Sequence, residues 1–130
     1  MLQEAWKVLA CNRWSVFMPR TEGGLHYPVG VWVRPAEGMP PLMVFAREGT
    51  ARAFTSTYAP WRVVRCEIRP TPEHRAPKKV LALGGFVYIG TRVRRWWAGA
   101  KAGKGAGLYS PLEIVPLRDT LFADAVRCLE

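Results

Sequence analysis

The sequence predicts a single α+β domain over residues 1–130, with a mainly antiparallel, bent sheet and one or two short helices. Three observations lead to this prediction. With 130 residues, the chain can bury a core without disulfide or metal support. Its 11 prolines and 12 glycines are spread along the chain, which favours short elements joined by turns over a helix bundle. Residues 42–69 have the pattern of a strand, a helix and a second strand, which gives the domain a core to build on.

The central unit begins with the apolar run Leu42–Phe45, which is typical of a buried strand. Residues 47–58 then change period: Ala51, Phe54 and Tyr58 are three and four residues apart, so they share one face of a helix. Pro60 is expected to end this helix, because a residue that precedes proline avoids helical angles.

The second strand of the unit is predicted over residues 61–69, where polar and apolar side chains alternate. Val64, Cys66 and Ile68 are expected to face inward, and the charged residues between them outward. Further strands are predicted over the remaining apolar runs, namely residues 5–10 and 14–18 as a hairpin around Asn12, 29–33, 80–89 (a bent strand or a tight hairpin) and 112–115. Residues 70–79 contain three prolines and several charges, which indicates a surface connection.

The C-terminal segment, residues 119–130, fits two structures. Asp119 could cap a helix, in which Leu121, Phe122, Ala125, Val126 and Leu129 would face inward. As a strand, the segment would place Phe122, Val126 and Cys128 on one face. We favour the strand.

The cysteines and the apolar runs bear on location. Cys11, Cys66 and Cys128 are odd in number and widely spaced, which favours reduced, buried thiols over a disulfide framework. The first residues lack the pattern of a signal peptide, and the longest apolar run, residues 80–90, is about half as long as a membrane helix requires. We expect a cytoplasmic protein with no membrane partner.

The positive charge is concentrated in one window. The formal net charge is +9, and residues 75–104 hold eight basic side chains and no acidic one. Within this window we predict a basic, glycine-rich surface loop over residues 91–109. The candidate binding residues of this loop are Arg92, Arg94, Arg95, Trp96, Trp97, Lys101 and Lys104.

These residue types suit a negatively charged, flat ligand. Arginine and lysine neutralise phosphates, tryptophan offers a face for stacking, and glycines let the backbone approach closely. The predicted partner is a nucleic acid or, on charge alone, an acidic protein surface. The alternative is a loop whose charges are only solvated, with one tryptophan packed beneath it.

No catalytic, metal-binding or cofactor-binding set can be assigned from spacing. The run GAKAGKG at residues 99–105 has too short a spacer for a phosphate-binding loop and lacks the hydroxyl that holds magnesium, so we expect no ATP or GTP hydrolysis. His26 and His74 have no metal-ligand neighbours at suitable spacing. Glu67 and Glu113 could act as bases, although a salt bridge with a neighbouring arginine is the more common role.

Two resemblances extend this reading. The motif Tyr27-Pro28-Val29-Gly30, the run Leu42–Phe45, the helix residues Ala51 and Phe54, and the strand residues 63–67 resemble small uncharacterised proteins encoded by bacteriophages and mobile elements. Many of those proteins end with a strand of the pattern Leu-x-Ala-x-x-Val, and residues 121–126 of this chain are similar to that strand. The resemblance implies a small binding protein, with host-defence inhibitors among the possible members of that class.

The strand–helix–strand unit is also similar to the split-sheet core of ADP-ribosyltransferases. That similarity implies NAD binding. In this chain only Glu113 lies far enough along to match the family's catalytic glutamate, and only His26 or Tyr27 could match its nicotinamide-contacting residue, so a shared fold implies an inactive relative.

The leading prediction is therefore a non-enzymatic protein that binds nucleic acid or an acidic partner through residues 92–104. The alternatives are an ADP-ribosyltransferase-like enzyme or its inactive relative, and a structural subunit in which Trp96 and Trp97 are buried against another chain.

Overall fold

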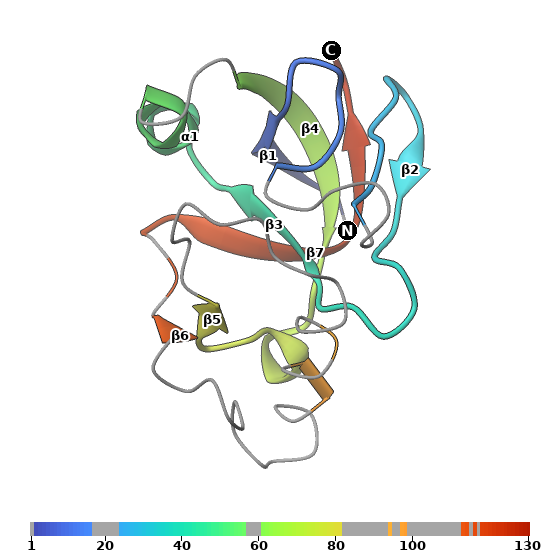
Figure 1. Cartoon of the computed structure of the whole chain (residues 1–130), viewed down its shortest axis with the longest axis vertical. Helices are drawn as coiled ribbons and strands as arrows, with labels where there is room; N and C mark the ends of the chain where they lie inside the picture. Colours follow the sequence, from blue (N-terminus) through green and yellow to red (C-terminus); the bar gives the residue numbers. More distant parts are fainter. Residues whose placement is uncertain are drawn as a thin grey trace.

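The computed structural model describes residues 2–16, 24–56, 61–81, 94, 97–98, 113–114, 116 and 118–130. The elements in these ranges are mostly strands, together with helix α1 and a short 3-10 helix (Figure 1). Along the chain they are β1 (Gln3–Leu9), β2 (Trp32–Val33), β3 (Leu42–Phe45), α1 (Glu48–Ser56), β4 (Arg62–Pro70), the 3-10 helix (Glu73–Arg75), β5 (Val80–Leu81), β6 (Glu113–Ile114) and β7 (Thr120–Cys128).

Four strands close into a small barrel. Strand β7 pairs with β3, β3 with β1, β1 with β4, and β4 again with β7, all antiparallel. Closure is possible because β7 is long: its first residues pair with β3 and its last with β4. The mainly antiparallel sheet predicted from the sequence is confirmed. It is closed into a barrel and not only bent, so the ring of four strands has no free edge. Strand β2 pairs with β7 outside the ring.

The core has two parts, one on each face of β1. Ala5 and Leu9 face the barrel interior, together with Tyr27, Val44 and Val64. On the other face, Val8 packs with Phe45 and Ala51 beneath the helix. These two faces follow from the alternation of side chains along a strand.

Helix α1 covers the outer part of the core. Ala51 is fully buried, and the Phe54 ring lies 5.5 Å from that of Phe45 and 5.9 Å from that of Trp61 between centroids. The predicted helical face of Ala51 and Phe54 is confirmed, while Tyr58 and Pro60 lie outside the described residues.

Strand β4 confirms the predicted alternation: Val64, Cys66 and Ile68 are buried, and Arg65 and Arg69 are exposed. The C-terminal segment is a strand, as favoured, but it contains a β-bulge. Ala125 lies opposite Arg69 and Ala123 opposite Pro70, so Asp124 has no partner on β4.

The bulge changes which side chains of β7 face inward. Leu121 and Ala123 face the interior before the bulge, and Val126 and Cys128 face it afterwards. Phe122 therefore does not share the face of Val126 and Cys128, contrary to prediction, because one extra residue reverses the alternation.

Strand β2 is shorter than predicted, and only the start of the strand predicted over residues 80–89 is described. Of residues 29–33, only Trp32–Val33 form β2, because Gly30 has a φ of +79° and turns the chain, leaving Val29 and Val31 exposed. Of residues 80–89, Val80–Leu81 form β5, which pairs with Glu113–Ile114 of β6; the rest of that segment lies outside the described residues.

The N-terminal hairpin is confirmed in part. The chain turns after β1, where the Arg13 amide donates to the Ala10 carbonyl oxygen and Leu9 forms a bridge with Ser15. Residues 17 and 18 lie outside the described residues.

The cysteines are all free thiols. Cys66 and Cys128 are buried opposite each other on β4 and β7. Cys11, predicted to be buried, is exposed, because it lies in the turn after β1 and not in a strand.

Candidate functional site

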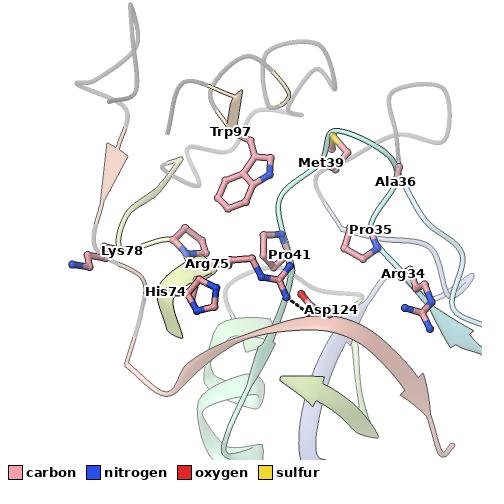
Figure 2. Close-up of a pocket in the computed structure, with 12 residues that line it drawn as sticks. Arg34, Pro35, Ala36, Met39, Pro41, His74, Arg75, Lys78, Trp97 and Asp124 are labelled. Carbon is pink, nitrogen blue, oxygen red and sulfur yellow. Dashed lines mark hydrogen bonds and ion pairs between the residues drawn. The ribbon is translucent and has the colours of Figure 1, made fainter. Parts of the chain in front are cut away.

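An open cleft of about 820 Å³ lies at one end of the barrel, where four segments distant in sequence meet (Figure 2). One wall is the connection between β2 and β3, the opposite wall is the connection after β4, and Asp124 of β7 lies between them. We call it the basic cleft; its lining residues are Arg34, Pro35, Ala36, Met39, Pro41, His74, Arg75, Ala76, Pro77, Lys78, Trp97 and Asp124.

The first wall is held by a tight turn between two prolines. The Met39 amide donates to the Ala36 carbonyl oxygen at 3.0 Å, and Gly38 has a φ of +76°, which favours glycine. Pro35 precedes this turn, and Pro40 and Pro41 follow it, so the backbone is restricted at both ends. This wall therefore presents a largely fixed, apolar surface beside the Arg34 side chain.

The second wall depends on the bulge in β7. The Asp124 carboxylate accepts hydrogen bonds from Thr71 Oγ1 at 2.9 Å and from Arg75 Nη2 at 2.7 Å. The 3-10 helix that carries Arg75 is closed by the Ala76 and Arg75 amides, which donate to the Pro72 carbonyl oxygen. The extra residue in β7 thus fixes the position of one of the cleft's cations.

The charge of the cleft is positive. Its lining carries three basic side chains, Arg34, Arg75 and Lys78, and the single carboxylate of Asp124 is already paired with Arg75. Within the described part of the chain, Arg34 and Lys78 have no ion pair, and both flank the cleft. A negatively charged ligand here would be met by two cations, Arg34 and Lys78, whose charge no described residue neutralises.

Two of the seven predicted binding residues are described, and both lie at this site. Trp97 lines the basic cleft, and in Figure 2 its indole projects toward Pro41 and Arg75. Arg94 lies against the first wall: its Nε donates to the Glu37 carbonyl oxygen at 3.3 Å, and its Cδ is 3.7 Å from the position of a Cβ on Gly38. The predicted residues Arg92, Arg95, Trp96, Lys101 and Lys104 lie outside the described residues, as does most of the predicted loop 91–109.

The sequence prediction did not include four residues that carry the cleft's charge: Arg34, Arg75, Lys78 and Asp124. Arg75 and Lys78 are in the basic window of residues 75–104, so the charge count contained a signal for them. Arg34 and Asp124 gave no such signal, since only the pairing of β2 and β3 with β7 brings them there.

The candidate residues for other chemistry lie elsewhere. Tyr27 is buried in the barrel, and the His26 ring packs on Trp14 with 5.2 Å between centroids, so neither lines the basic cleft. Glu67 accepts a hydrogen bond from Arg127 at 2.7 Å, which confirms the expected salt bridge. Glu113 is in β6, and its side chain is outside the described residues.

Among the described residues, no three histidine, cysteine or carboxylate side chains are placed to hold a metal ion. The part of the chain that the structure describes also contains no helix long and apolar enough to cross a membrane. In comparisons with protein-family models, with curated proteins and with solved structures, no match to this chain was found.

Proposed function

We propose that this protein is a non-enzymatic binding protein that holds single-stranded nucleic acid in the basic cleft. One observation carries the proposal: the Trp97 indole lines the same open cleft as Arg34 and Lys78, two cations without a carboxylate partner in the described residues. A ring for stacking beside cations for phosphates is the usual composition of a single-strand binding site.

The tryptophan favours nucleic acid over an acidic protein. An acidic protein surface requires only cations, whereas a base also requires a flat ring on which to stack, and each stacked base contributes about 1–3 kcal/mol. The proline-lined wall beside Arg34 adds apolar surface for the same purpose. Bases are exposed in this way only when they are not paired within a duplex, so the ligand is single-stranded.

The proposed function is one that the sequence predicts, but the proposed binding site includes residues outside the predicted basic loop. Trp97 and Arg94 belong to the predicted basic loop, while Arg34, Arg75 and Lys78 come from the two walls of the cleft. A cytoplasmic location, which the sequence predicts, would give the protein access to such a ligand. The similarity to phage-encoded proteins stays a prediction.

The test is fluorescence anisotropy with labelled single-stranded and duplex oligonucleotides across a salt series. We expect tighter binding to single strands, with an affinity that falls linearly with salt on logarithmic axes. The double variant Arg34→Ala/Lys78→Ala should reduce the magnitude of that slope by about 1.4, since each phosphate contact on a single strand contributes about 0.7.

The matched control is Arg52→Ala/Arg62→Ala, which removes the same charge from two exposed side chains that do not line the cleft. It should retain the wild-type slope. Absence of oligonucleotide binding at low salt would overturn the proposal. In that case, binding of an acidic polypeptide would favour a protein partner, and saturable NAD binding would favour the ADP-ribosyltransferase-like alternative.

A further inference from the structure

A second tryptophan lies among arginines on the outer surface of the barrel. The guanidinium carbon of Arg127 is 4.8 Å from the centroid of the Trp32 ring, and that of Arg69 is 5.0 Å from it. The three side chains come from three neighbouring strands, β2, β7 and β4. We call this set, Trp32, Arg69 and Arg127, the outer platform.

Strand register explains how the platform is built. Trp32 lies directly opposite Arg127, so the two side chains share a face. Arg69 is on the far side of β7, opposite Ala125, so the contact between Arg69 and Trp32 spans β7. The β7 residue opposite Arg69 is a small alanine that is completely buried, which leaves room for this contact.

The two arginines differ in charge balance. Arg127 donates to Glu67 at 2.7 Å, and its side chain is only 33% exposed. Arg69 is exposed and has no ion pair within the described residues. In the platform, the charge of Arg127 is therefore neutralised by Glu67, and this arginine and the Trp32 ring position each other. The charge of Arg69 is available to a ligand.

The outer platform is continuous with the basic cleft through two strands. On β7, Asp124 of the cleft immediately precedes Ala125, which lies opposite Arg69 of the platform. Trp32 of β2 is two residues before Arg34 of the cleft, which directly follows this strand. Asp124 and Arg127 are three positions apart on β7, a path of about 10 Å at the usual rise of a strand.

We propose that the outer platform is a second subsite, over which a single-stranded nucleic acid continues when it leaves the basic cleft. This inference rests on the proposed function. Arg69 would contact a backbone phosphate, and the Trp32 and arginine planes would stack a base. A strand that occupies both subsites must be longer than one that fills the cleft alone.

The proposal is tested by the dependence of affinity on oligonucleotide length. Labelled single strands of about 4 and about 12 nucleotides span the footprints of small single-strand binding folds. We expect the wild-type protein to bind the longer strand more tightly than the shorter one. Arg69→Gln should weaken binding of the longer strand at least about fivefold, which is the lower limit for loss of one stacked or charged contact. The affinity for the shorter strand should stay unchanged.

Arg62→Gln is the matched control, since Arg62 is exposed at the opposite end of the same strand β4 and has no ion pair among the described residues. Trp32→Ala provides a second variant, with thermal unfolding to verify its fold. Equal effects of Arg69→Gln and Arg62→Gln on the longer strand would overturn the second subsite and leave the cleft intact. Failure of the wild-type protein to bind either strand would overturn the proposed function and the subsite together.

Discussion

The side-chain amine of Lys7 donates a hydrogen bond to the backbone carbonyl oxygen of Met43, 2.8 Å away, across β1 and β3. The same amine lies 5.1 Å from the centroid of the buried Tyr27 ring. Lys7 is between Ala5 and Leu9 on β1, so it is on the strand face that forms the barrel interior. An ammonium group there loses most of its hydration, and burial lowers the pKa of Lys7 to about 8.

This lysine should make stability depend on pH. Its pKa in the unfolded chain is the ordinary 10.5, so the cost of burying the charge is present in full below about pH 8 and is relieved as pH rises toward 10.5. Relative to Lys7→Met, the free energy of unfolding of the wild-type protein should increase by about 1 kcal/mol between pH 7 and pH 9. Chemical denaturation at a series of pH values measures this difference.

The comparison with Lys7→Met is needed because the buried thiols act in the opposite direction. Burial raises the pKa of Cys66 to about 12 and also raises that of Cys128, so their contribution to stability is lost as pH rises above the ordinary thiol pKa of about 9. Lys7 lowers the pKa of both thiols, so Lys7→Met can only raise the pKa of each further. The buried thiols therefore stay protonated up to pH 9 in both folded proteins, and their effect cancels between pH 7 and pH 9. Wild-type and variant stabilities that stay parallel from pH 7 to pH 9 would contradict a desolvated Lys7.

The elements that the sequence predicted are those whose signals are local. Alternation over residues 61–69 depends only on neighbours in sequence, and the buried side chains Val64, Cys66 and Ile68 confirm it. The period of Ala51 and Phe54 is local in the same way. The closure of the barrel is not local, because it requires β4 to pair with β7, and no pattern within either strand identifies its partner.

The bulge at Asp124 shows the same limit at the candidate site. An inserted residue leaves no mark in the sequence, so the sequence predicts an unbroken alternation, which puts Phe122 on the wrong face. The bulge also fixes Asp124 beside Arg75, which is the anchor of one wall of the cleft. Composition identified Trp97 and Arg94, since these belong to one basic window, but not Arg34, which only the fold brings to the same cleft.

A second stability prediction concerns the junction of β7 and α1. Asp119 has a φ of +65°, and its carboxylate accepts a hydrogen bond from Thr50 Oγ1 at 2.8 Å in the first turn of the helix. Asp119→Ala should lower the free energy of unfolding by about 2 kcal/mol, from the lost hydrogen bond and the strained backbone together. Asp119→Gly, which relieves the backbone strain, should lower it by only about 1 kcal/mol. Equal losses for the two variants would contradict the role of backbone strain.

The cysteines should differ sharply in reactivity. Thiol reagents attack the thiolate, and burial raises the pKa of both Cys66 and Cys128. Cys11 is exposed. In the native protein at neutral pH we expect a colorimetric thiol reagent to label one of the three cysteines rapidly, and all three after denaturation. Cys11→Ser should abolish the rapid phase; a rapid phase that persists in this variant would show that the barrel opens to the reagent.

The last prediction concerns the charge of the basic cleft. Asp124 neutralises Arg75 at 2.7 Å, so Asp124→Asn should free one cation and strengthen binding of single-stranded nucleic acid at low salt. One additional phosphate contact should steepen the salt dependence by about 0.7, measured by anisotropy. The free energy of unfolding of this variant should fall by at most about 1 kcal/mol, because the ion pair between Asp124 and Arg75 is partly exposed.

The control is Glu48→Gln, which removes the same charge from helix α1. The residues of this helix do not line the cleft, so the slope of the salt dependence should stay unchanged. A weaker affinity for Asp124→Asn would instead show that Asp124 holds Arg75 in the position that the ligand requires.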